Sequence, residues 1–236
     1  MKNELAMYAI IATSDFKRPI CFTSTQELKE LGLDKYVRQT GMSYQLVPVM
    51  NQTIDSDVAY KNMMTKFSFG NAKNPNVYFD EENRRHLNSM RLAFSQVAQA
   101  LAIEGKRDSA QQLLRKFDAE TNEKNFPYGM TSNRGNQHNY FSYLFLQACY
   151  ASGELKLANK VSVSILKDLK QAVAYYKSLG EAMSDDQFFV NAENAYQGKP
   201  NSLANKQIAF VQDILTCGQL IEAVNKMEKD FSIAKK

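Results

Sequence analysis

The chain has 236 residues, with 29 Lys and Arg against 25 Asp and Glu, so its formal net charge is +4. Hydrophobic residues make up 44% of it, while glycine (10) and proline (5) are scarce. This composition excludes a wholly disordered chain and disfavours collagen and β folds rich in tight turns. The basic residues are scattered rather than gathered into a stripe, so we expect no nucleic-acid partner.

The cysteines and the apolar runs indicate little about the compartment. Cys21, Cys149 and Cys217 are far apart and odd in number, so they cannot form a closed set of disulfides. Each has apolar neighbours, which is typical of a small buried side chain. The longest apolar run, residues 5–12, is well short of the about 20 residues that span a bilayer. We expect no membrane span in this chain, and its first residues lack the features of an export signal.

Residues 1–79 are predicted to form a small α/β segment with two short strands. The second strand alternates apolar and polar residues with a period of two, and its Pro48 places it at a sheet edge or at the end of the strand. The relative orientation of the two strands stays open. The predicted elements are a helix at 4–13, a strand at 18–23, a helix at 25–31 closed by Gly32, a helical turn at 33–39 and a strand at 43–49.

Helical patterns dominate from residue 55 onward. Asp55 or Ser56 is predicted to cap a helix that runs to about Phe67, and residues 70–75 have the composition of a loop. Asp80 is a suitable N-cap for a long helix that ends at Gly105, and a second helix follows at 109–119. Apolar spacings of three and four predict which side chains face the core; they are Leu87, Met90, Phe94, Val97, Ala98 and Leu101, then Ala110, Leu113, Leu114 and Phe117.

A glycine followed five residues later by alanine occurs three times, at Gly105, Gly153 and Gly218. Glycine permits a left-handed turn, and the small alanine lets a second helix pack closely on the first, so we predict three helical hairpins. The pattern resembles the tetratricopeptide repeat, although the intervals of 48 and 65 residues differ from its repeat of about 34. The predicted fold class is mainly α: an irregular tetratricopeptide-like helical-hairpin array at 80–236, preceded by the α/β segment at 1–79 and packed with it as one unit.

Five phrases carry a more specific resemblance, which covers most of residues 1–160. They are residues 17–22 (KRPICF), 31–36 (LGLDKY), 41–48 (GMSYQLVP), 66–70 (KFSFG) and 77–85 (VYFDEENRR). In this order they resemble the C-terminal, extracytoplasmic region of a family of bacterial polytopic membrane proteins. That family is related to C-type glycosyltransferases of the protein O-mannosyltransferase-like class. Cys21 stands where the family usually has tyrosine.

The resemblance implies a periplasmic location and a membrane-embedded part of the same protein as a possible partner. It does not imply a catalytic residue, because the membrane-spanning half that carries the family's chemistry is absent from these residues. We expect no cofactor and no metal: His86 and His138 are the only histidines, and a zinc site needs three or four ligands.

Five residues are weak binding candidates, each with a structural alternative. Arg84 and Arg85 could bind an anion, but the acidic residues beside them suit the start of a helix, where Glu81 and Arg85 have the spacing of an ion pair. Arg91 lies on the apolar face of the same helix, so it forms an internal ion pair or faces a groove. The remaining candidates, Tyr140 and Tyr143, either fill the core or grip a sugar or peptide.

These observations favour a non-catalytic binding domain that recognises a protein, peptide or glycan acceptor through its helical repeats. Two alternatives remain open. The domain could be purely structural and stabilise a membrane partner, or it could be a stand-alone enzyme of unknown class. An enzyme requires a polar pocket with titratable groups shifted from their ordinary pKa. The sequence contains no nucleotide-binding or nucleophile motif that points to one.

Overall fold

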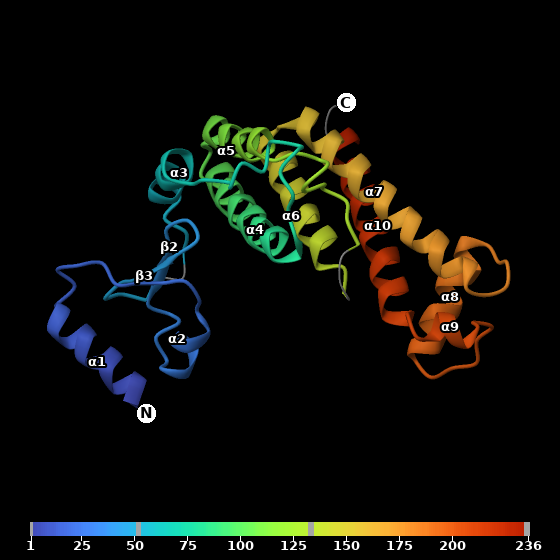
Figure 1. Ribbon diagram of the computed structural model, residues 1–236, viewed down its shortest axis with the longest axis horizontal. Helices are drawn as coiled ribbons and strands as arrows, with labels where there is room; N and C mark the ends of the chain where they lie inside the picture. Colours follow the sequence, from blue (N-terminus) through green and yellow to red (C-terminus); the bar gives the residue numbers. More distant parts are fainter. Residues whose placement is uncertain (1, 51–52, 132–134, 234–236) are drawn as a thin grey trace.

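The computed structural model describes residues 2–50, 53–131 and 135–233. It confirms a mainly helical fold with a small α/β segment at the N-terminus (Figure 1). The helices are α1 (Lys2–Ser14), α2 (Gln26–Glu30), α3 (Ser56–Thr65), α4 (Glu81–Ile103), α5 (Arg107–Glu120), α6 (Gln137–Ser152), α7 (Leu155–Ser178), α8 (Asp185–Tyr196), α9 (Asn205–Ile208) and α10 (Val211–Ile233).

The sheet has one strand more than predicted. Its order is β1 (Cys21–Phe22), β3 (Tyr44–Leu46), β2 (Val37–Gln39), with both pairs antiparallel. The prediction of a helical turn at 33–39 is therefore wrong at its end. Residues 37–39 alternate buried, half-buried and buried, and Gly41 at φ +130° turns the chain back into β3. Pro48 lies just after the end of β3, where its missing N–H breaks no strand pairing.

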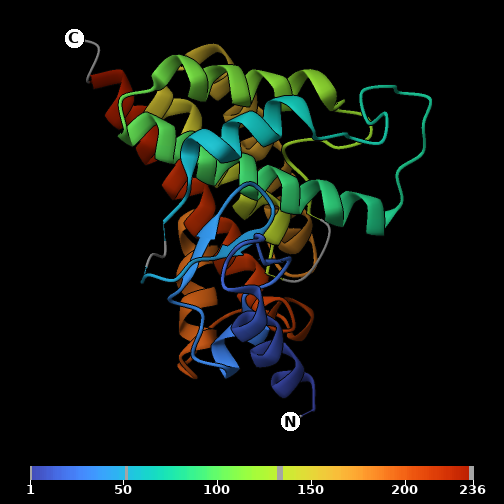
Figure 2. The same ribbon diagram turned by 90° about the vertical axis from the view of Figure 1, so that its left-hand side faces the viewer.

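Two separate cores organise the chain. The small one contains Leu28, Val37 and Leu46, and among the described side chains of α1 the partly buried Ile11 packs against it. The large one joins α3 to the helices that follow it, because Ala59 and Met63 of α3 are fully buried there. Figures 1 and 2 show the small unit joined to the helical body through α3, with α1 on the outer side, away from α7 and α10. The domain boundary at residue 79 stays a prediction.

The predicted helix starts and buried faces in the first part of the helical body are confirmed. The Asp55 carboxylate accepts the backbone N–H of Val58, and the Asp80 carboxylate accepts that of Asn83, which satisfies donors that the first helical turn leaves unpaired. Every apolar residue predicted to face the core on α4 and α5 is buried. The rings of Phe94 and Phe117, with centroids 5.3 Å apart, connect these two helices in the core.

Two of the three predicted hairpins are present. Gly105 joins α4 to α5 at φ +79°, and Gly153 joins α6 to α7 at φ +81°. Both conformations are left-handed, which is costly for a residue with a Cβ. Ala110 and Ala158, five residues after these glycines, are fully buried, as close packing of the paired helices requires.

The third predicted hairpin is wrong. Gly218 lies inside α10, where the chain does not turn. A Cβ at this position would come within 2.8 Å of the Phe189 ring on α8, so the glycine provides space for a ring on a neighbouring helix. Because a glycine at a helix contact and a glycine at a turn look alike in the sequence, the described residues contain two such hairpins rather than an array of three.

Candidate functional site

A polar groove lies where the first turns of α4 and α6 meet the loop between α5 and α6. Its volume is about 530 Å³. Both binding candidates from the start of α4, Arg84 and Arg85, line it. The polar side chains that line it are Glu81, Glu82, Arg84, Arg85, Asn88, Thr131, Gln137 and His138.

Two exposed charges at the rim of the polar groove, Glu82 and Arg85, are paired on α4 itself. Arg85 donates to both carboxylate oxygens of Glu82, at 2.9 and 2.5 Å. The expected pair of Glu81 with Arg85 is therefore wrong, because Glu82, three residues before the arginine, binds it instead. The hydrogen bond from Arg85 lowers the pKa of Glu82, and the bond to Glu82 raises the pKa of Arg85. Both side chains stay charged at neutral pH.

Arg84 is fixed by the loop that closes the polar groove. Its Nε donates to the backbone carbonyl of Asn125 at 3.0 Å. The Asn125 side chain in turn donates to the carbonyls of Ala72 and Asn74, at 3.2 and 2.7 Å. This chain of bonds leaves the two Nη groups of Arg84 as donors at the groove, held on a side chain whose stem is already positioned.

Asn88 contributes an acceptor that nothing in the described residues satisfies. Its side chain is buried, and Oδ1 has no hydrogen-bond partner. Buried polar atoms in folded proteins almost always have a partner. Oδ1 is enclosed in the wall of the groove, so a ligand donor reaches it only when the Asn88 side chain rotates. Sequence reasoning missed Asn88, because its spacing resembles that of any polar residue on a helix.

Arg91 lies beneath the groove instead of lining it. The side chain is 0% exposed. Nη1 donates to the Ser142 hydroxyl at 2.6 Å and Nη2 to the Pro127 carbonyl at 3.0 Å. The guanidinium carbon lies 3.9 Å from the centroid of the Phe126 ring. Neither alternative predicted for Arg91 is observed among the described residues: it has neither a bonded carboxylate partner nor a face in a groove.

Burial also sets the protonation of the groups beneath the groove. It lowers the pKa of Arg91 to about 9, so the guanidinium remains charged at neutral pH. Burial, together with the charge of Arg91, lowers the pKa of His138 to about 3, so this imidazole is neutral. Nε2 of His138 lies 2.7 Å from the Pro127 carbonyl. Arg91 and His138 thus hold the same loop carbonyl from two helices.

The other candidates do not line the polar groove. Tyr140 on α6 is half-exposed beside Phe141, and Tyr143 is half-buried against the large core, where its hydroxyl accepts from Gln147. His86 lies at the surface and pairs with Glu82. Within residues 2–50, 53–131 and 135–233, no three His, Cys, Asp or Glu side chains gather where they could hold a metal ion.

Two cysteines fit the prediction of a buried side chain and one does not. Cys149 and Cys217 are buried, and burial raises the pKa of both thiols, to about 12 for Cys217. Neither is an activated nucleophile. Cys21 is exposed, because its strand is at the edge of the sheet and its side chain points away from the small core.

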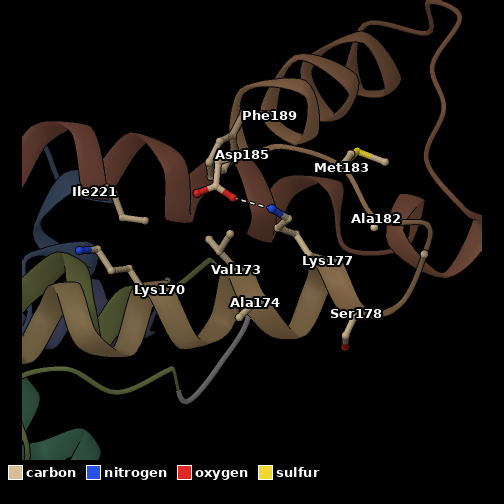
Figure 3. Close-up of a pocket in the computed structure, with 11 residues that line it drawn as sticks. Lys170, Val173, Ala174, Lys177, Ser178, Ala182, Met183, Asp185, Phe189 and Ile221 are labelled. Atoms are coloured by element: carbon tan, nitrogen blue, oxygen red, sulfur yellow. Dashed lines mark hydrogen bonds and ion pairs between the residues drawn. The ribbon is translucent and has the colours of Figure 1, made fainter.

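A second, more apolar groove of about 730 Å³ lies between α7 and the pair α8 and α10. Figure 3 shows Lys170, Val173 and Lys177 of α7 facing Asp185, Phe189 and Ile221 across it. Lys177 pairs with Asp185 at 2.6 Å. Gly218, where the sequence pattern predicted a turn, makes room for the Phe189 ring that lines this groove.

Comparison with known proteins relates the N-terminal part of the chain to a described family. Among the described residues, no helix combines the length and the apolar character needed to cross a bilayer. No curated protein matches the chain, and no solved structure matches it. Residues 1–66, which comprise α1, the sheet, α2 and α3, match the family described as TMEM260-associated domain 2.

Proposed function

We propose that this chain is a non-catalytic recognition domain that accompanies a membrane protein and holds a peptide segment of a protein ligand in the polar groove. The observation that carries the proposal is the unsatisfied Oδ1 of Asn88 in the wall of a groove that Arg84 also lines, where a rotation of the Asn88 side chain would offer Oδ1 to a ligand donor. A peptide backbone offers N–H donors and C=O acceptors in alternation, and this pair of groups complements both.

A peptide fits the groove better than a glycan, the other ligand class that the sequence favours. Sugar rings are commonly held against aromatic faces, and none of the described residues that line the polar groove is aromatic. The groove instead combines carboxylates, two guanidinium groups and amides, whose hydrogen bonds suit a polar main chain.

The protonation of the groove supports binding over catalysis. A general acid or base works best when its pKa lies near the working pH. Here the pKa of Glu82 is lowered, that of Arg85 is raised and that of His138 is about 3. Each of these groups keeps one protonation state around neutral pH, which suits a fixed pattern of donors and acceptors.

The match of residues 1–66 to a domain named for its association with TMEM260 supports the membrane-protein context. We place the domain on the extracytoplasmic side, in agreement with the family resemblance of its sequence phrases. Cys21 provides a direct test, because it is exposed while Cys149 and Cys217 are buried. In intact cells that express the native protein, a membrane-impermeant maleimide labels Cys21 if the location is right and labels it only after lysis if the domain is cytoplasmic.

The binding experiment uses the full chain on immobilised peptide and glycan arrays, followed by calorimetry on the peptides that bind. We expect Asn88→Leu and Arg84→Gln each to weaken binding by about tenfold or more, since each leaves a ligand polar group unpaired. Arg107→Gln, an exposed arginine at the start of α5, is the matched control and keeps the affinity. Binding that survives both groove substitutions, or ligands that are only glycans, contradicts the proposal.

A purely structural role is the second candidate, and the internal bonds of Arg84 and Arg85 favour it. Deleting the domain from the native protein separates the two roles. Lost activity at normal abundance supports recognition, whereas lost abundance supports stabilisation of the membrane partner.

A further inference from the structure

Between residues 5 and 13, the outward face of α1 carries no charge. At 3.6 residues per turn, positions 5, 6, 8, 9, 10, 12 and 13 cover one continuous arc of about 200°. All seven are exposed, and they are Leu, Tyr, Ile, three Ala and Thr. Leu5 is 69% exposed and Ile10 is 57% exposed. Helices at a protein surface normally place charged and polar residues on the solvent side, so this face has the composition of a covered one.

The two polar groups on this face are already satisfied within the chain. The Thr13 hydroxyl donates to the carbonyl of Ala9 at 2.7 Å. The Tyr8 hydroxyl donates to the carbonyl of Leu31 at 3.3 Å. Both hydroxyl donors therefore keep their partners when an apolar environment replaces water. The main free-energy cost of moving the face out of water, an unpaired polar group, is thus absent.

The C-terminal end of this face has residues typical of a membrane interface. Asp15 follows α1, then Phe16, Lys17 and Arg18, and all four are exposed. Lys17 shares a salt bridge with Asp15 in which both side chains are largely exposed, so its charge remains near solvent. Aromatic rings and long cationic side chains lie at the boundary between acyl chains and headgroups. Arg18 and Lys17 can reach lipid phosphates while Leu5 and Ile10 contact acyl chains.

We propose that α1 lies flat on a lipid surface, with its outward face in the boundary between headgroups and acyl chains. A fluid acyl layer adapts to any apolar contour and demands no hydrogen bonds, which matches a face whose polar groups are all satisfied internally. The polar counterpart that an interfacial helix needs is the unit behind it, since Ile11 fixes the other side of α1 to the small core. Figure 1 shows α1 on the outer side of that unit, away from the helical body.

Flotation of the full chain with vesicles tests this proposal. The vesicles are phosphatidylcholine alone and phosphatidylcholine mixed with phosphatidylserine. We expect the chain to float with both, and more strongly with the anionic vesicles because of Lys17 and Arg18. Ile10→Glu should lower the partition coefficient by about tenfold or more, since it puts a charge where the proposal has an apolar side chain in contact with acyl chains.

Val163→Glu is the matched control, because Val163 on α7 is also 57% exposed. It should change the partition by no more than about twofold, because α7 does not touch the lipid. Circular dichroism checks that both variants stay folded. A chain that stays in solution with both vesicle types, or equal loss in both variants, overturns the proposal. So does a concentration-dependent dimer that Ile10→Glu abolishes without vesicles, which assigns the face to a second copy.

Discussion

The imidazole of His138 is buried and neutral in the folded protein, and it becomes exposed to solvent when the protein unfolds. Its pKa is about 3 in the folded protein, mainly because of burial, and close to the ordinary 6.5 after unfolding. Between these values the unfolded chain binds a proton that the folded chain does not. The free energy of unfolding therefore falls as the pH is lowered from about 6.5 towards 3, by up to about 1.4 kcal/mol per pH unit.

We predict that wild-type protein loses on the order of 2–3 kcal/mol of stability between pH 6.5 and 4.5 through this residue. His138→Gln should have a flatter profile in urea denaturation over this range, whatever its stability at neutral pH. His86→Gln is the control, because His86 is exposed. Identical slopes for wild type and His138→Gln would contradict the burial effect.

Arg91 gives a second prediction at the level of one side chain. Arg91→Ala leaves a cavity among Phe126, Tyr128 and Phe117 and removes one of the two side chains that hold the Pro127 carbonyl, so we expect a loss of about 3–5 kcal/mol. Arg91→Met keeps most of the volume and removes the cost of a buried charge, so it should lose less than half as much. Chemical denaturation measures both, and equal losses would show that the hydrogen bonds of Arg91 outweigh its packing.

Local signals made some residues predictable and left others hidden. Asp55 and Asp80 were found because a cap depends on the few residues that follow it. Arg84 and Arg85 were found as a charged pair next to a helix start. Asn88 and the surroundings of Arg91 depend on how residues 121–131 fold over α4, and no local pattern encodes that contact.

At the level of helices, two kinds of glycine follow one sequence pattern. Gly153 needs its left-handed conformation, and Gly218 needs its missing side chain because of Phe189. We predict that Gly153→Ala costs about 1–2 kcal/mol in any background. Gly218→Ala should destabilise the wild type but stabilise a Phe189→Ala background by up to about 1 kcal/mol, since alanine favours the helix once the ring is gone.

A double-mutant cycle followed by thermal denaturation measures this coupling. The decisive result is that the effect of Gly218→Ala on stability changes sign in the Phe189→Ala background, whereas the effect of Gly153→Ala does not. If Gly218→Ala destabilises the Phe189→Ala background as much as the wild type, the close approach of α8 to α10 does not explain Gly218. The same ambiguity explains why spacing alone predicted a third hairpin that the fold lacks.

For the molecule as a whole, the two cores predict where the chain can be divided. The links from the small unit to the helical body include the bond from Gln39 to Gln96 and the bond from Asn62 to the Thr40 carbonyl. We therefore expect a fragment of residues 54–236 to unfold cooperatively, at a cost of about 1–3 kcal/mol relative to the full chain. A fragment of residues 68–236 should be far less stable, because it lacks the buried Ala59 and Met63.

Circular dichroism during urea unfolding compares the two fragments. A molten 54–236 fragment would mean that the sheet unit is part of the same folding unit as the helices.

The helical class was predictable from periodicity along α4 and α5. The division into two cores was harder to predict from the sequence, because α3 follows the sheet in the chain but packs with the helices.

The central claim is that the polar groove holds a peptide without converting it. The most direct measurement is a calorimetric titration of the full chain with an array-selected peptide, followed by mass spectrometry of the recovered peptide. We predict saturable binding that Asn88→Leu weakens by about tenfold or more and a peptide of unchanged mass. A peptide returned cleaved or modified, or an affinity that Asn88→Leu leaves intact, would contradict the claim.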